Sequence, residues 1–599
     1  MIQQTAKNTT TTRRTYQNRV NYRRTNSRPI TKNRIQSAKP SAVPSDEAVR
    51  FVPLGGLEEV GRNCAYFEHK DEIIIVDMGI QFPEEDTPGI DYIIPNISSL
   101  EPKKNNIRGI ILTHGHYDHI SALPYVIEKL GNPPIYTALF AKEMVAKRFE
   151  EFPNLPKPRF NVVKNNDTIQ ISEHFSVKFF NIEHSIPDAM GIILETPIGK
   201  LAHFGDFRVE TTKDGKPTNL GIFERIGEMD IHSIFLDSTN SLKDGFTTSE
   251  RIVEENIEQL FKNAKGRIII GMFASLITRV IEVIKIATVK FNRKIAINGR
   301  SMKDNTQIAQ NLGYLKMDKN YAINLEDVHK YKDENIMILT TGAQGESNAG
   351  LMRIVNGEHR IISLKNTDTV IFSSSVVPGN ERSVQSLQDN IARQVDETYN
   401  SKLLDIHTSG HAHAEDLKLV MKLTKPKFIV PIHAFYFMRK HVQKLAETVN
   451  VKKDQIKLVD NGQICLLTKD SFIVTDEKVP TNYVMVDGLG IGDVEEVVLR
   501  DRLTLAKEGM VVVITSLDRQ TGKILKNPDI ISRGFIYLKE NQELLNEIRK
   551  RIRNLIGRIP RNQPLDPDYA KSLIRDQIGQ FLYNKTKRRP MILPVIIEV

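Results

Sequence analysis

The sequence predicts an α/β protein of several domains, in which a parallel α/β module is inserted into another α/β domain. Three observations support this prediction. The chain has 599 residues, well beyond the length at which a single hydrophobic core stops growing. Apolar runs of strand length repeatedly end at a histidine or an aspartate. Between about residues 247 and 405 the pattern changes to helices alternating with short strands, and candidate ligands lie on both sides of this segment.

The densest group of potential ligands lies in one short segment, ILTHGHYDHI, between a predicted strand and a helix predicted over 120–130. Imidazole and carboxylate suit Zn²⁺ or Mn²⁺, and the segment contains no thiolate of the kind that structural zinc fingers use. The close spacing indicates two ions about 3.5–4 Å apart, as in two-metal hydrolases. The candidate ligands in this segment are His114, His116, Asp118 and His119.

More polar residues follow other predicted strands. The strand predicted over 72–76 ends at Asp77, and four further runs end in the same way. Because strand ends can converge on one edge of a sheet, where α/β ligand sites lie, these residues predict a single site. The four runs and the residues that follow them are 177–182 with His184, 200–204 with Asp206, 233–236 with Asp237, and 428–432 with His433.

The predicted boundaries follow from these changes of pattern. Helices are expected over 249–264, with Ser249 as N-cap, and over 276–291; strands are expected at 268–272, 295–298 and 336–340. After about residue 470, strands are predicted at 511–515, 534–538 and 595–599, and a helix at 541–556. The predicted parts are a disordered basic tail (1–48), the metal-binding domain in two pieces (49–245 and 406–472), the inserted module (246–405), a linker (473–485) and a C-terminal domain (486–599).

The net charge of +10 comes from the N-terminal tail. Residues 1–45 contain ten Lys or Arg and no Asp or Glu, which leaves 73 basic against 73 acidic residues in the rest of the chain. Such a segment has too few large apolar residues to fold alone. It suits an arm that binds phosphate backbones, a solubilising leader or a transit peptide, and the sequence leaves these alternatives open.

Cysteine usage and hydropathy exclude two classes of protein. The two cysteines, Cys64 and Cys465, are far apart in sequence, so no disulfide framework is expected, and a reducing cytoplasmic location is predicted. No apolar run reaches 18 residues, so no membrane span is expected. The N-terminus lacks the apolar core of a secretory signal.

Taken together, the motifs resemble a known family. THGHYDHI followed by His184, Asp206 and His433 is similar to the ligand order of the metallo-β-lactamase fold. LDSTN, GRSM, TGAQGE, FSSSVVPGNE and HTSGHA resemble the β-CASP nucleases, and VDGLGIGDV, PDIISRGF and KTKRRPMILPVI resemble bacterial ribonuclease J within that group. The resemblance covers the chain from about residue 50. It implies a metallo-β-lactamase αββα sandwich with an inserted parallel α/β β-CASP domain and a small α+β C-terminal domain.

The resemblance also implies roles for individual residues. Two Zn²⁺ ions per subunit are implied, with Mn²⁺ or Mg²⁺ as alternatives. One ion is expected at His114, His116 and His184, and the other at Asp118, His119 and His433. Asp206 would bridge the two ions, and Asp77 would orient ligands. The implied catalytic residues are His411, Asp237 and Asp118, and the implied substrate-binding residues are His407, Thr408, Ser409, Gly410 and His411.

The implied activity is that of a ribonuclease in rRNA processing and mRNA turnover. It would cut RNA internally and degrade it 5′ to 3′ from a monophosphorylated end. A metal-generated hydroxide would attack phosphorus, and His411 would protonate the departing 3′-oxygen. The implied partners are single-stranded RNA, a homodimer or homotetramer formed through the C-terminal domain, and an RNA-degrading complex. The alternatives are a catalytically silent RNA-binding subunit, a β-CASP nuclease acting on DNA, and another hydrolase of the fold such as a thioesterase.

Two segments depart from the family pattern. FASLITRV has Leu276 and Thr278 where the family usually has Asn and His. PIHAFYF has Ala434, Phe435 and Phe437 in place of the usual Gly-Glu and Arg. Both departures lie close to the expected site without replacing a ligand. The substrate contacts and the balance of exonuclease and endonuclease activity therefore stay open.

Overall fold

The computed structural model describes most of the chain after the N-terminal tail. The predicted tail, 1–48, lies outside the described residues except for its last two positions, and the domains below belong to the unit Val43–Val599. The described residues are 47–83, 87–346, 348–377, 379–488, 490–492, 496–519, 521–536, 541–559 and 566–599.

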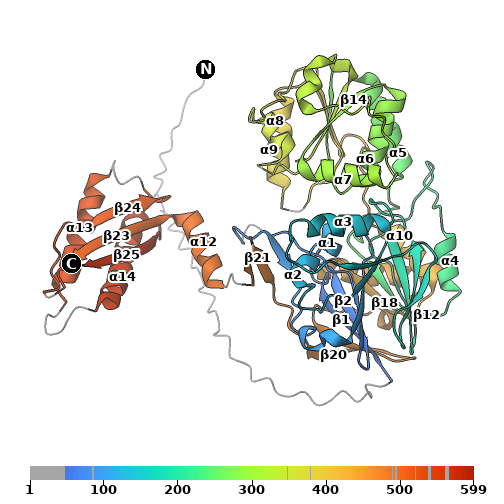
Figure 1. Ribbon diagram of the computed structural model, residues 1–599, viewed down its shortest axis with the longest axis horizontal. Helices are drawn as coiled ribbons and strands as arrows, with labels where there is room; N and C mark the ends of the chain where they lie inside the picture. The colour runs from blue at the N-terminus through green and yellow to red at the C-terminus, as the bar shows by residue number, and fades with distance from the viewer. Residues whose placement is uncertain are drawn as a thin grey trace, which may run out of the picture. The chain divides into compact units, whose positions relative to one another are not determined.

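Two β-sheets form the centre of the metal-binding domain (Figure 1). The first sheet has the order β20 (Phe472–Lys478), β19 (Gln463–Leu467), β1 (Val49–Gly55), β2 (Cys64–His69), β3 (Glu72–Val76), β5 (Ile107–Ile111), β6 (Pro134–Thr137) and β7 (Arg159–Val162). The second has the order β18 (Phe428–Ile432), β12 (Ile231–Asp237), β11 (Gly199–His203), β10 (Met190–Thr196), β9 (Ser176–Asn181) and β8 (Thr168–Gln170).

The inner faces of the two sheets share one apolar core. Alternate residues of a strand point to the same face, so Phe51 of β1 and Phe67 of β2 meet Phe235 of β12. The ring centres of Phe51 and Phe235 are 4.6 Å apart, and those of Phe67 and Phe235 are 5.3 Å apart. Helices bury the outer faces: α1 (Tyr117–Ile120), α2 (Leu123–Val126) and α3 (Leu139–Phe149) on the first sheet, and α4 (Gly221–Gly227), α10 (Ala414–Thr424) and α11 (Tyr436–Thr448) on the second. The predicted αββα sandwich is confirmed.

The inserted module interrupts the second sheet between two neighbouring strands. β12 and β18 pair in parallel, with Asp237 opposite Ile432, although the whole module separates them in sequence. The module has a five-stranded parallel sheet, and in Figure 1 its strands lie between α8 (Gly350–Val355) and α9 (Glu381–Ala392) on one side and α5 (Glu250–Asn263) and α6 (Ile277–Lys285) on the other. The strand order is β14 (Lys294–Asn298), β15 (Ile336–Thr340), β13 (Ile268–Gly271), β16 (Thr369–Phe372) and β17 (Glu397–Asn400).

Local sequence signals explain where several helices begin and end. Ser249 caps α5 as predicted, because its hydroxyl accepts a hydrogen bond from the backbone N–H of Arg251. The helix predicted over 120–130 is wrong as one continuous element, since α1 ends at Ile120 and α2 begins at Leu123. Pro124 explains the break: proline has no N–H to donate and fits only the first turn of a new helix.

The C-terminal domain has a three-stranded sheet with β23 (Met510–Leu517) between β24 (Asp529–Arg533) and β25 (Met591–Glu598). Helices α13 (Gln542–Gly557) and α14 (Pro567–Thr586) share an apolar core with this sheet. The strand predicted at 534–538 is wrong over its described part, 534–536. The strand ends at Arg533 because Gly534 adopts a φ of +66°, which breaks the extended ladder.

The segment predicted as a linker, 473–485, is partly β-structure. β20 extends to Lys478, and β21 (Val484–Asp487) pairs antiparallel with β4 (Tyr92–Ile94). The two cysteines are buried free thiols, as expected. Among the residues that the structure describes, no helix combines the length and apolarity needed to cross a membrane.

Candidate metal centre

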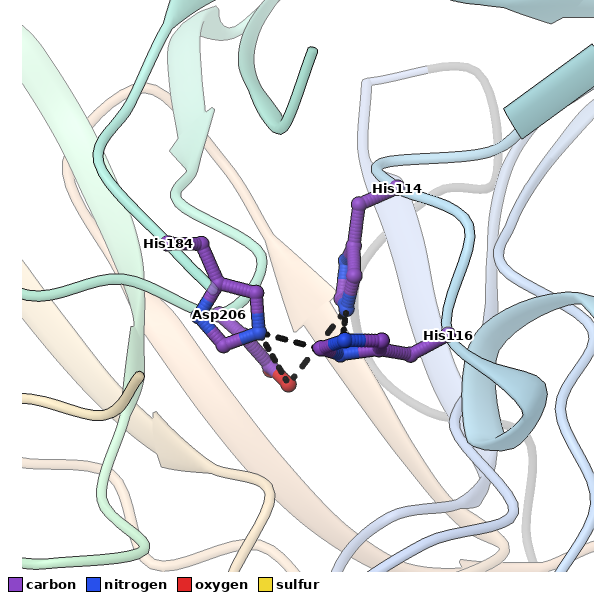
Figure 2. Close-up of side chains that lie close together, drawn as sticks. All are labelled: His114, His116, His184 and Asp206. Carbon is purple, nitrogen blue, oxygen red and sulfur yellow. Dashed lines mark hydrogen bonds and ion pairs between the residues drawn. The ribbon is translucent and has the colours of Figure 1, made fainter. Parts of the chain in front are cut away.

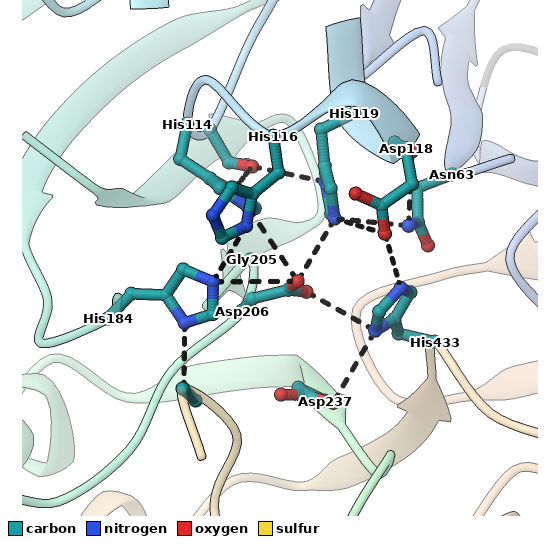
Figure 3. Close-up of polar contacts among 12 residues, drawn as sticks. Asn63, His114, His116, Asp118, His119, His184, Gly205, Asp206, Asp237 and His433 are labelled. Atoms are coloured by element: carbon teal, nitrogen blue, oxygen red, sulfur yellow. Dashed lines mark hydrogen bonds and ion pairs between the residues drawn. The ribbon is translucent and has the colours of Figure 1, made fainter. Parts of the chain in front are cut away.

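The predicted ligands meet at the carboxyl ends of strands from both sheets (Figure 3). Asp77 directly follows β3, and the HGHYDH segment follows β5, which runs parallel to β3. On the second sheet His184, Asp206, Asp237 and His433 lie at the ends of β9, β11, β12 and β18. Parallel strands bring their carboxyl ends to one edge, so residues far apart in sequence share one site. Asp77 and His433 have φ values of +60° and +53°, a left-handed conformation that is uncommon outside glycine.

The first group of ligand atoms contains three imidazoles and one carboxylate (Figure 2). His116 Nδ1 lies 3.0 Å from His114 Nε2 and 3.1 Å from His184 Nε2. Asp206 Oδ2 lies 3.7 Å from His114 Nε2 and 4.0 Å from His184 Nε2. All four ligand atoms are within 4.8 Å of one another, a convergence that suits one ion bound by neutral imidazole and carboxylate.

The second group shares Asp206 and adds Asp118, His119 and His433 (Figure 3). His119 Nε2 lies 3.1 Å from Asp206 Oδ2 and 3.7 Å from Asp118 Oδ2. His433 Nε2 lies 3.1 Å from Asp118 Oδ2, and its Nδ1 lies 3.5 Å from Asp206 Oδ1. Asp206 Oδ2 therefore lies beside ligand atoms of both groups, so the Asp206 carboxylate is shared by the two groups.

Hydrogen bonds from the far side of the rings orient these ligands. His119 Nδ1 lies 2.8 Å from Asp77 Oδ2, and His184 Nδ1 donates to the Gly410 carbonyl at 2.7 Å. The backbone N–H of Thr113 donates to Asp77 Oδ1 at 2.8 Å, and its hydroxyl lies 3.0 Å from His114 Nδ1. These bonds occupy one nitrogen of each ring and direct the other nitrogen towards the centre, as outer partners of metal ligands do.

Burial and charge give the rings different protonation states. Burial lowers the pKa of His114 and His184 well below the ordinary value, so both rings are neutral, the form that binds metal. Burial also opposes the charge on His119, but the carboxylates of Asp206, Asp118 and Asp77 outweigh it and raise the pKa of His119 well above the ordinary value. The clustered carboxylates thus stabilise positive charge at the centre, and a divalent cation supplies such charge.

His411 and Asp237 form a hydrogen-bonded pair beside the two groups. His411 Nδ1 lies 2.8 Å from Asp237 Oδ2 and 3.9 Å from Asp206 Oδ2. Burial lowers the pKa of His411, but Asp237 and Asp206 more than compensate, and the net pKa is raised. The side chain of His411 is 22% exposed, whereas that of Asp237 is fully buried. His411 can therefore reach a bound substrate while Asp237 supports it from within the protein.

The predicted substrate loop, 407–411, is fixed by its own polar groups. The Thr408 hydroxyl donates to the Thr248 carbonyl at 2.7 Å, and the Ser409 hydroxyl accepts from Asn240 Nδ2 at 2.7 Å. A Cβ at Gly410 would lie 2.5 Å from the His184 ring, so only glycine fits there. Of the five predicted residues, His407, Ser409 and His411 are half-buried, and Thr408 and Gly410 are buried.

A buried ionic network joins this loop to the inserted module. Glu250 at the start of α5 accepts from Arg208 Nη1 at 2.8 Å and from Arg279 Nε at 2.9 Å. Arg208 also donates to the Ser409 carbonyl at 3.3 Å, and Arg279 donates to the Ile406 carbonyl at 3.2 Å. The position of the module is thereby linked to the backbone just before the loop, at Ile406, and within it, at Ser409.

Sequence reasoning missed the residues that orient the ligands. Thr239 Oγ1 lies 2.7 Å from Asp237 Oδ1 and 2.8 Å from His433 Nδ1, and Asn63 Nδ2 lies 3.1 Å from His119 Nε2. Thr113, Thr239 and Asn63 lie within THGH, LDSTN and GGLEEVGRN. Their position inside these motifs is the one signal in the sequence that could have identified them as residues that orient the ligands.

The geometry defines a metal-binding α/β protein of the metallo-β-lactamase type with a module inserted beside the centre. Family models match this division. The "Metallo-beta-lactamase superfamily" model matches residues 57–244, the "Ribonuclease J, beta-CASP domain" model matches 265–391, and the "Ribonuclease J C-terminal domain" model matches 497–599.

Curated relatives give the same result over nearly the whole chain. Ribonuclease J 1 of Streptococcus pyogenes serotype M3 is 38% identical over 91% of this chain and 96% of its own length. Ribonuclease J2 of Bacillus subtilis is 34% identical over 92% of this chain and 99% of its own, and Ribonuclease J 2 of Staphylococcus aureus (strain NCTC 8325) is 33% identical over 92% and 98%. The chain belongs to the ribonuclease J family.

A solved structure also resembles this fold. A protein of unknown function from Enterococcus faecalis V583 aligns over 70% of this chain and all of its own, with a TM-score of 0.50 and 16% sequence identity. At this identity the likeness concerns the fold alone.

Proposed function

We propose that the chain is a metal-dependent ribonuclease that hydrolyses phosphodiester bonds with two Zn²⁺ ions, or Mn²⁺, per subunit. The observation that carries the proposal is the pair of ligand groups that share Asp206, with His411 and Asp237 beside them. Membership of the ribonuclease J family supports RNA as the substrate. A catalytically silent RNA-binding subunit would have no need for a complete ligand set.

The proposed roles follow the two ligand groups. His114, His116 and His184 would bind one ion; Asp118, His119 and His433 would bind the other; and Asp206 would bridge them. Asp77 would fix the ring of His119 through their 2.8 Å contact. When bound, two divalent ions supply an activated water at neutral pH and stabilise charge on the phosphoryl oxygens.

His411 is the proposed general acid for the departing 3′-oxygen. Asp237 accepts a hydrogen bond from His411 Nδ1, which leaves Nε2 available to donate to the substrate, and the raised pKa favours the protonated ring. Loop 407–411 would contact the substrate phosphate through the side chains that the loop's own bonds leave accessible.

The remaining proposals concern the setting of the reaction. The two buried free thiols support a reducing compartment, the cytoplasm. Family membership supports two further proposals, assembly into a homodimer or homotetramer through the C-terminal domain and association with an RNA-degrading complex. The inserted module is proposed to span 246–405, and the matched β-CASP segment, 265–391, lies within these bounds.

The 5′ end of the RNA is expected to control degradation. RNA with a 5′-monophosphate should be shortened processively from that end, whereas 5′-triphosphate and 5′-hydroxyl RNAs should be cut mainly at internal sites. The measurement is product length over time with each RNA labelled at the 3′ end, in the presence of Mn²⁺ or Zn²⁺. Equal degradation of the three RNAs from the 5′ end would contradict the proposed selectivity.

Replacing Asp237 with asparagine is expected to shift the pH profile of cleavage. An acid acts while it is protonated, so activity is present below the pKa of His411 and is lost as pH rises through that pKa. Removing the carboxylate lowers this pKa, and the alkaline limb of kcat should move down by about one to three pH units. Asp244→Asn, an exposed site in the following loop, is the matched control. An unmoved alkaline limb in Asp237→Asn would refute the assigned pair.

A further inference from the structure

Three consecutive aromatic side chains are exposed beginning two residues after the proposed ligand His433. Phe435 is 37% exposed, Tyr436 is 49% exposed and Phe437 is 56% exposed. The rings of Phe435 and Phe437 are nearly parallel, with an interplanar angle of 11° and centres 6.1 Å apart. Large aromatic residues are normally buried, and a group of them left in solvent marks a binding surface.

The exposed segment is fixed to the reaction centre at both of its ends. The Thr239 hydroxyl lies 2.8 Å from the main-chain carbonyl of His433, and the Ser241 hydroxyl donates to the carbonyl of Met438 at 2.9 Å. Thr239 and Ser241 belong to the segment that follows Asp237, and Asp237 is hydrogen-bonded to the proposed general acid, His411. The same segment therefore contacts both ends of the aromatic stretch and adjoins the partner of the general acid. A molecule that lies on these rings is therefore adjacent to the metal centre.

Charge on the same helix identifies the kind of molecule. Lys440 and Lys444 are exposed on α11, three and seven residues after Phe437, which places them on the same helix face. Tyr436 differs from its neighbours, because the Arg439 guanidinium lies 5.5 Å from its ring centre. Aromatic surfaces next to basic side chains are the features by which proteins bind single-stranded nucleic acid, since every base has a flat face and every linkage a phosphate.

We propose that Phe435 and Phe437 form a stacking site for a nucleobase of single-stranded RNA, with Lys440 contacting the adjoining backbone phosphate. The inference rests on the proposed ribonuclease function and specifies how that site binds its substrate. Stacking is tolerant of base identity, so the site contributes affinity and register without selecting a sequence.

RNAs that lack one base at a defined position provide the test. With the wild-type enzyme, one or two abasic positions should raise KM about tenfold, because stacking at those positions is lost. The Phe435→Ala/Phe437→Ala variant should bind the complete RNA about tenfold more weakly and should show no further increase at the same positions. Phe435→Tyr/Phe437→Tyr should restore the wild-type profile. Tyr569→Ala removes an aromatic residue that is 55% exposed on α14 and serves as the control.

A second variant tests the phosphate contact separately. Lys440→Gln should reduce the slope of log KM against log salt by about 0.7, the value for one phosphate contact on a single strand. Thermal unfolding of each variant verifies that it is folded.

Three results would overturn the inference. The first is an abasic profile in the double alanine variant identical to the wild-type profile, and the second is an unchanged salt slope in Lys440→Gln. The third is unchanged RNA binding by the double alanine variant together with a changed oligomeric state in sedimentation. The last result would assign these rings to a protein contact. Failure of the proposed function is distinct, since the wild-type enzyme would then cleave no RNA at all.

Discussion

Replacing Asp206 with alanine is expected to abolish RNA cleavage and to remove divalent metal from both ligand groups. Asp206 Oδ2 lies 3.1 Å from His119 and 3.7 Å from His114, and Oδ1 lies 3.5 Å from His433, so one carboxylate serves both groups. Its loss should reduce cleavage by more than the roughly 10–100-fold caused by removing an outer partner of a ligand. Metal content by mass spectrometry and steady-state cleavage of labelled RNA are the measurements.

Asp77→Asn is the matched control for this experiment. Asp77 is equally buried and contacts His119, but it lies outside both ligand groups. Asp77→Asn should retain metal. It should lose activity only by the roughly 10–100-fold typical of residues that hydrogen-bond to a metal ligand, because the ring of His119 would be less well oriented. Retention of two ions and of most activity in Asp206→Ala would contradict the assignment of Asp206 as the bridge.

Replacing His411 with alanine is expected to reduce turnover by about 10²–10⁴-fold while metal content stays unchanged. The side chain is partly exposed and bonded to Asp237, the arrangement of a proton donor supported by a buried carboxylate. Single-turnover cleavage isolates the chemical step, and metal analysis of the same preparation tests the second half of the expectation.

The alternative role for His411 is visible in the same geometry. His411, Asp237, Asp206 and His433 form a third group whose ligand atoms converge within 4.8 Å. Loss of metal in His411→Ala would therefore identify a ligand instead of an acid. His413→Ala, two residues further along and at the N-cap of α10, controls for disturbance of the loop and should retain most turnover.

The insertion and the convergence of the ligands could be predicted because the information is local, whereas the αββα sandwich is implied by the resemblance to the metallo-β-lactamase fold. A buried strand followed by a single polar residue occurs at Asp77, Asp206 and His433, and the parallel arrangement of the strands then brings these ends together. The helix at 120–130 and the strand at 534–538 failed for equally local reasons. In the helix, Pro124 lies in the first turn of a new helix that follows a break. In the strand, Gly534 has a positive φ, so the observed strand β24 ends at Arg533, one residue before the predicted strand would begin.

What sequence reasoning could not supply is the pairing of side chains across the fold. The contact of Thr239 with His433 and that of Glu250 with Arg208 and Arg279 join elements that only tertiary packing brings together. The sequence also could not show which aromatic side chains are buried in the core and which are exposed to solvent. PIHAFYF departs from the family pattern, but the sequence does not indicate that Phe435 and Phe437 are exposed, which the structure shows.

Metal-dependent cleavage of RNA tests the central claim most directly. The purified protein is incubated with 5′-monophosphorylated RNA and a DNA of the same sequence, with Mn²⁺ or Zn²⁺ or with a chelator, alongside the Asp118→Ala/His119→Ala variant. We expect cleavage of RNA alone, abolished by the chelator and absent in the variant. Cleavage that survives in the variant, persists without divalent metal or occurs equally on DNA would contradict the account.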